Sequence, residues 1–134
     1  MNKLTKEFLY FFLILFIAFL IVIPVFGIEN IKSGELILSI HSTYFVMKLT
    51  NFLIVYLPLF VSISYLIRII VLKFKNFYSN LIYLISNGLL ILVLLIFLFN
   101  SLNSGFKANI NFLGFLIVLL TFEIYVLIKI KKLE

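Results

Sequence analysis

Hydrophobic positions along the chain fall into four long uncharged stretches separated by polar connections. Each stretch is close to the ~20 residues that a helix needs to cross the hydrocarbon core of a bilayer. The pattern therefore predicts an all-α membrane protein, a bundle of four transmembrane helices in a single integral membrane domain over residues 1–134. We place the spans at about 8–26, 46–72, 81–99 and 112–128.

The composition supports lipid as the solvent of most of the chain. Of 134 residues, 65% are apolar and 12% are charged, and the mean hydropathy is +1.30. That much hydrocarbon surface cannot be buried inside a water-soluble domain of this length. The lipid bilayer is therefore the first predicted partner, and little chain remains for a soluble domain.

Basic residues give the predicted orientation. They stand at the ends of the apolar stretches instead of forming an aromatic-interleaved patch, so the net charge of +6 does not indicate a nucleic-acid partner. With both termini in the cytoplasm, the count is eight inside against three outside, which is the bias typical of plasma membrane proteins. We expect a multi-pass protein of a bacterial inner membrane. The inner residues are Lys3, Lys6, Arg68, Lys73, Lys75, Lys129, Lys131 and Lys132, and the outer ones are Lys32, Lys48 and Lys107.

The connection from Ile28 to Thr43 is the longest polar piece, yet it is too apolar for a freely solvated loop. Ser33 could cap a short helix beginning at Gly34. A strand from Glu35 to Ile40 is the alternative. In either case we expect the segment to lie at the membrane surface.

Pro58 lies near the middle of the second span. It cannot donate a hydrogen bond to the carbonyl of Ile54, so a bend is expected there. Such a bend is usually structural, and a hinge is the functional alternative.

Polar side chains mark the beginning of the third span. Asn80, Tyr83 and Asn87 are spaced three and four residues apart and therefore share one helical face. Beyond Gly88 the span is wholly apolar as far as Phe99.

Glu123 is the candidate for intramembrane chemistry, because a carboxylate at the centre of a membrane helix costs about 2.5 to 3.5 kcal/mol. It lies roughly 9 Å of helix rise before Lys129, and Arg68 lies at a similar depth before Lys73. An Arg guanidinium can donate two parallel hydrogen bonds to a carboxylate. The sequence therefore predicts an intramembrane polar cluster with an Arg68–Glu123 pair at its centre. Its members are Arg68, Glu123, Asn87, Tyr83 and Tyr65.

Three interpretations of this cluster stay open. Its ionic groups could clamp the helices in one register. The side chains of Arg68 and Glu123 could instead extend separately to the inner headgroups. In the third interpretation, Glu123 changes protonation as part of a proton- or ion-linked transport site.

The absence of other motifs bears on enzymatic chemistry. The sequence has no Cys and one His, which argues against thiolate chemistry, a metal site and a metal cluster. It also lacks a glycine-rich phosphate loop and a nucleophile elbow. We expect no enzymatic activity, no metal and no cofactor.

The predicted role is that of a small accessory, anchoring or sensing subunit that works through helix contacts within the membrane. Its partners would be copies of itself in a homo-oligomer or a larger membrane protein complex. The main alternative function is a small oligomeric transporter or channel with a proton- or ion-linked Glu123. The outer half of the third span has no polar side chain, which disfavours a water-filled path. A membrane immunity or defence protein is a third class that the residues do not separate from the first.

Overall fold

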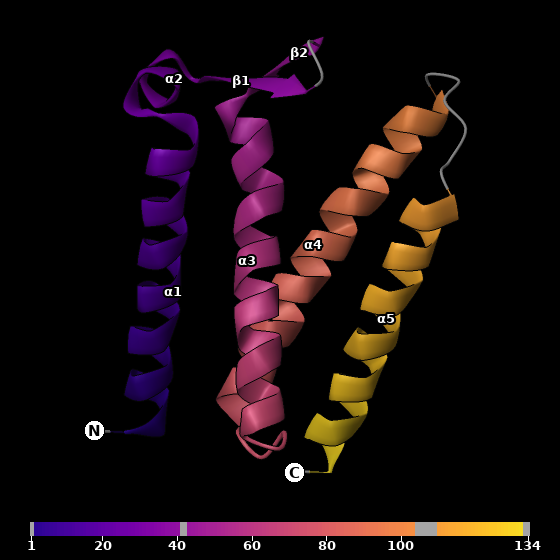
Figure 1. Cartoon of the computed structure of the whole chain (residues 1–134). Coiled ribbons are helices and arrows are strands. Elements are labelled where there is room, and N and C mark those ends of the chain that lie inside the picture. Colours follow the sequence, from indigo (N-terminus) through magenta and orange to yellow (C-terminus); the bar gives the residue numbers. More distant parts are fainter. Residues whose placement is uncertain (1, 41–42, 104–109, 133–134) are drawn as a thin grey trace. The chain divides into compact units, whose positions relative to one another are not determined.

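The computed structural model describes residues 2–40, 43–103 and 110–132. Four of its helices are long and apolar enough to cross a membrane, which confirms the predicted number of candidate spans. The elements in chain order are α1 (Lys3–Phe26), α2 (Ile28–Ser33), β1 (Glu35–Ile40), β2 (Thr43–Lys48), α3 (Leu49–Val71), α4 (Phe77–Asn103) and α5 (Ile110–Lys131) (Figure 1).

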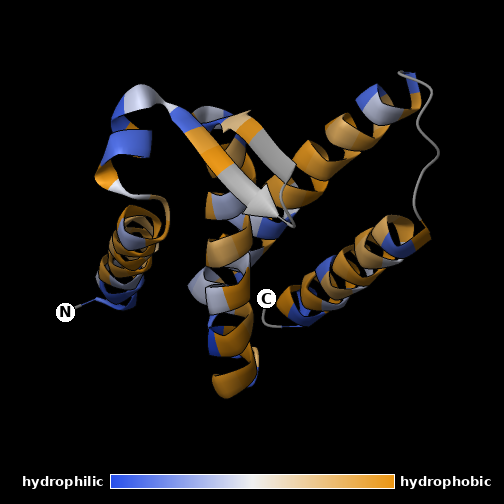
Figure 2. Ribbon diagram, turned by 45° about the horizontal axis from the view of Figure 1, so that its top comes forward, coloured by the Kyte–Doolittle hydropathy of each residue, from blue (hydrophilic) through white to orange (hydrophobic). Residues whose placement is uncertain are grey.

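Hydrophobic residues cover most of each long helix (Figure 2). The helices α1, α4 and α5 extend past the predicted spans because hydropathy does not register the polar residues in their end turns. The chain is thus a nearly all-helical, multi-pass membrane protein. The prediction of an all-α fold needs one correction, since a two-stranded antiparallel hairpin precedes α3.

The hairpin pairs β1 with β2, with Glu35 opposite Lys48 and Leu36 opposite Met47. The strand alternative for residues 35–40 is therefore confirmed, and the helix beginning at Gly34 is wrong. Residues 46–48 belong to β2, and α3 begins at Leu49, a few residues after the start of about 46 given for the second span. Hydropathy alone does not distinguish a strand from a helix, whereas the Thr, Tyr, Phe and Val of β2 favour a strand.

Gly34 joins α2 to this hairpin. Its φ of 72° lies in the left-handed region, where a residue without Cβ is least strained, and it ends α2. Its carbonyl also accepts a hydrogen bond of 2.8 Å from the backbone N–H of Leu49, the first residue of α3. Both ends of the hairpin are thereby held at one point.

The contacts of the chain group into two units, residues 1–60 and residues 61–134. In the first unit, the hydroxyl of Tyr56 donates a hydrogen bond of 3.1 Å to the carbonyl of Ala18 in α1. The rings of Phe26 and Phe52 meet edge to face with centroids 4.8 Å apart, and Phe52 stacks on Tyr56. Ala18 is fully buried, so its small side chain lets α3 approach the backbone of α1.

In the second unit, α4 is the most buried candidate span. Its buried face begins with polar side chains and turns apolar after Asn87, because the buried positions recur at helical spacing while their residue types change. The buried residues are Ser79, Asn80, Tyr83, Ser86, Asn87, Leu90, Ile91 and Leu94.

A Schellman turn ends α3 and reverses the chain into α4. The N–H of Phe74 donates to the carbonyl of Ile69 at 2.8 Å, and the N–H of Lys73 donates to the carbonyl of Ile70 at 3.0 Å. Lys73 and Phe74 have φ values of 50° and 60°. Glycine is the usual residue in this conformation, so these two side chains are held in the turn at a cost in backbone strain.

Two asparagines then start α4. The side-chain oxygen of Asn76 accepts a hydrogen bond of 3.1 Å from the N–H of Tyr78, which is an N-cap. The side-chain amide of Asn80 donates to the carbonyl of Phe74 at 2.8 Å. These bonds fix the turn to the first turns of α4.

Pro58 lies within α3, which is helical from Leu49 to Val71. The first unit ends shortly after it, at Phe60. The hinge role of Pro58 stays a prediction.

Candidate functional site: an intramembrane polar cluster

Asn87 connects three helices of the second unit. Its side-chain amide donates to Oε2 of Glu123 at 2.5 Å and to the carbonyl of Leu119 at 3.2 Å, both on α5. Its side-chain oxygen accepts a hydrogen bond of 3.2 Å from the hydroxyl of Ser62 on α3. A primary amide has two N–H donors, and both are used here.

The carboxylate of Glu123 packs against the backbone of α4 at Gly88. A Cβ placed on Gly88 would lie 3.4 Å from Oε1 of Glu123. Because Gly88 directly follows Asn87, α4 offers a hydrogen-bond donor and an open side-chain position to the same carboxylate. The carboxylate of Glu123 therefore lies close to the backbone of α4.

Two tyrosines of the second unit are buried. Tyr83 is 1% exposed and interacts electrostatically with Glu123. Tyr65 on α3 is fully buried. Tyr83 lies one helical turn before Asn87, so α4 presents both residues on one face.

The structure places Arg68 on α3, three positions beyond Tyr65, with its side chain half-buried. The hydrogen bond that we describe to Glu123 comes from the amide of Asn87. The predicted pairing of Arg68 with Glu123 stays a prediction.

Two further polar atoms are buried at the beginning of α4. Within the described part of the chain, the hydroxyl of Ser79 and the side-chain oxygen of Asn80 have no hydrogen-bond partner. An unsatisfied buried polar group costs about 1 to 3 kcal/mol. The side chain of Asn87 has hydrogen-bond partners for its amide and its oxygen, whereas these two atoms have none in the described chain.

Sequence reasoning missed Ser62 and Gly88. Ser62, Tyr65 and Ile69 form the buried face of α3 at helical spacing, so a helical projection around Tyr65 could have identified Ser62. Gly88 carried a weaker signal, namely its position next to the only polar stripe of the third span.

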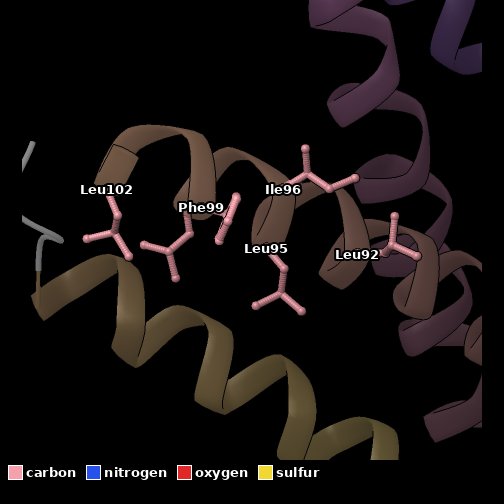
Figure 3. Close-up of a pocket in the computed structure, with 6 residues that line it drawn as sticks. Leu92, Leu95, Ile96, Phe99 and Leu102 are labelled. Atoms are coloured by element: carbon pink, nitrogen blue, oxygen red, sulfur yellow. The ribbon is translucent and has the colours of Figure 1, made fainter. Parts of the chain in front are cut away.

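An apolar groove of about 450 Å³ lies on the other half of α4. Figure 3 shows the side chains of Leu95 and Leu102 on the side of α4 that faces α5. Among the residues that the structure describes, no polar side chain lines the groove, so none of them can orient a polar ligand there. The lining residues are Leu92, Leu95, Ile96, Leu98, Phe99 and Leu102.

These features define a multi-pass α-helical membrane protein with an amide–carboxylate cluster inside one group of helices. Among residues 2–40, 43–103 and 110–132, no three His, Asp or Glu side chains gather as a metal site would require. Comparisons with protein-family models, curated proteins and solved structures found no match to this chain.

Proposed function

We propose that the protein is a non-enzymatic subunit of a membrane assembly, acting through helix contacts within a bacterial inner membrane, with both termini in the cytoplasm. Its cluster around Asn87 is then a structural clamp. The observation that supports this role is the saturation of Asn87, whose two N–H groups are both bound within the chain. A substrate site needs polar groups that are available to the substrate, and this amide offers no donor.

The apolar surface of α1 fits the same role. Only 17% of its most hydrophobic 18 residues is buried, the same share as in α5, but α1 also presents Phe8, Phe12 and Phe16, each more than half exposed. Such a surface suits lipid and transmembrane helices of other chains equally well, because association in the bilayer depends on close packing and interhelical hydrogen bonds. We assign α1 as the contact helix of the subunit.

The test is the mass of the particle extracted in a gentle detergent, with each chain in it identified and quantified. A complex of fixed stoichiometry, with itself or with a second membrane protein, is expected. Phe12→Ala and Phe16→Ala on α1 should weaken it, while Phe97→Ala, an exposed phenylalanine on α4, serves as the matched control. A lone monomer under all extraction conditions contradicts the proposal.

A small oligomeric transporter or channel is the second candidate, supported by the intramembrane carboxylate of Glu123. The Glu123→Gln variant separates the two candidates. Its amide oxygen can still accept a hydrogen bond from Asn87, so a clamp survives, but the variant cannot bind and release a proton. An ion flux in liposomes that depends on pH and is abolished in this variant would establish transport. An unchanged flux would exclude a role for Glu123 in transport.

A further inference from the structure

One end of the second unit gathers cationic and aromatic side chains around the turn between α3 and α4. The ring of Phe74 in that turn meets the ring of Tyr125 on α5 edge to face, with centroids 5.3 Å apart. The ammonium of Lys129 lies 5.4 Å from the centroid of the Tyr125 ring. Lys73 and Lys75 are the sequence neighbours of Phe74, so the turn brings two more lysines to the end of the unit where Lys129 contacts this aromatic pair.

Among the described residues at this end, the charge is one-sided; Glu134, two positions after Lys132 in the sequence, lies outside them. Lys73 and Lys75 are exposed, as are Lys131 and Lys132 at the end of α5. Within residues 61–103 and 110–132, Glu123 is the only acidic residue, and its carboxylate is bonded to Asn87. The lysines therefore attract anions, and no acid in this described part of the unit is placed to neutralise them.

We infer that this end of the unit binds the headgroup of an anionic phospholipid. Lysine ammonium groups bind phosphate as point charges, and clusters of basic residues beside membrane spans favour anionic lipids. Tyrosine and phenylalanine at the same level suit the boundary between headgroups and acyl chains. The strained turn fits this role, because it keeps Lys73 and Phe74 at positions where glycine would be less strained.

The test uses tryptophan fluorescence, since the chain has no Trp of its own. A Phe74→Trp variant places one reporter at the basic end, and Phe99→Trp places one at the far end of α4, where the side chain is exposed. Each is reconstituted in vesicles containing brominated phosphatidylglycerol or brominated phosphatidylcholine, and quenching gives the relative affinity for the two lipids. In the Phe74→Trp variant, phosphatidylglycerol should be preferred by about threefold or more. In the Phe99→Trp variant, the two lipids should bind with equal affinity.

Removing Lys73 and Lys75 together as Lys73→Gln and Lys75→Gln should abolish the preference, as should high salt. Lys32→Gln with Lys48→Gln removes the same charge from the other unit and should leave it intact. Circular dichroism checks that each variant keeps its helices. Equal affinities at both reporters, or a preference that persists without Lys73 and Lys75, would overturn the inference. If the lysines instead bind an acidic segment of a protein, both reporters should show equal affinities for the two lipids.

Discussion

Asn87 and Glu123 are joined by one of the two amide N–H groups of Asn87, while the other is held by the carbonyl of Leu119 one turn earlier on α5. A single side chain of α4 therefore contacts both the backbone and a side chain of α5. We expect this pair to contribute more to the packing of α4 on α5 than any apolar contact between them.

A double-mutant cycle tests this relationship. Asn87→Leu leaves a carboxylate without its donor in an apolar setting and should lower the free energy of unfolding by about 2 to 4 kcal/mol. Glu123→Leu should cost about 1 to 2 kcal/mol, because Asn87 keeps one partner on α5. The double variant should be less destabilised than the sum, with a coupling of about 1 to 3 kcal/mol. Unfolding in mixed micelles measures all of these, and strictly additive losses would show that the bond does not stabilise the bundle.

Gly88 and Gly114 form a matched pair of helical glycines. A leucine at position 88 would displace Glu123, since a Cβ there already lies 3.4 Å from the carboxylate, whereas no atom lies within 4 Å of a Cβ at Gly114. Gly88→Leu should destabilise the protein by about 1 to 3 kcal/mol, and Gly114→Leu should leave it unchanged or slightly more stable. The same unfolding assay applies. Similar effects at both positions would contradict the close approach of Glu123 to α4.

Ser62 and Ser79 are buried serines with opposite hydrogen-bond status. The hydroxyl of Ser62 donates to Asn87, while that of Ser79 has no partner within the described chain. Ser62→Ala should therefore cost about 0.5 to 1.5 kcal/mol, and Ser79→Ala should be neutral or stabilising. A thermal-stability comparison of the two purified variants is sufficient, and the reverse order of stability would disprove the assignment.

Ala18 tests the packing of the first unit. It is fully buried, and its carbonyl accepts the hydroxyl of Tyr56. Ala18→Leu should separate α1 from α3 and cost about 1 to 3 kcal/mol, whereas Phe19→Leu, at an exposed position, should have little effect. Cysteine pairs introduced across α1 and α3 should cross-link more slowly after Ala18→Leu. An unchanged cross-linking rate would contradict this packing.

The number of candidate spans could be predicted from sequence because lipid imposes a length and a polarity on each of them. Hydropathy does not reveal the strand β2, since Thr43–Lys48 is followed without a break by the apolar residues of α3, and the β propensity of its residues is only a weak indication. Pairing with β1 decides that segment, and pairing is a non-local interaction.

The candidate site was predictable in part for a similar reason. Helical spacing placed Tyr83 and Asn87 on one face, and counting residues placed Glu123 at a comparable depth. Depth does not determine which side chain reaches the carboxylate, because that depends on the rotation of each helix about its own axis. The contacts of Ser62 with Asn87 and of Gly88 with Glu123 depend on those rotations, although helical spacing from Tyr65 already places Ser62 on the buried face of α3.

The position of Asn87 in the middle of three helices has a consequence for biosynthesis. The ribosome completes α4 before α5 exists. During translation, the side chain of Asn87 can therefore bond to Ser62 on α3, but its two acceptors, the carbonyl of Leu119 and the carboxylate of Glu123, are not yet present. The helix that follows α4 out of the ribosome thus supplies the hydrogen-bond acceptors for an amide already in the membrane. The unpaired amide on α4 should therefore favour the membrane insertion of α5. A nascent chain stopped before Leu119 should be a preferred target for membrane proteases.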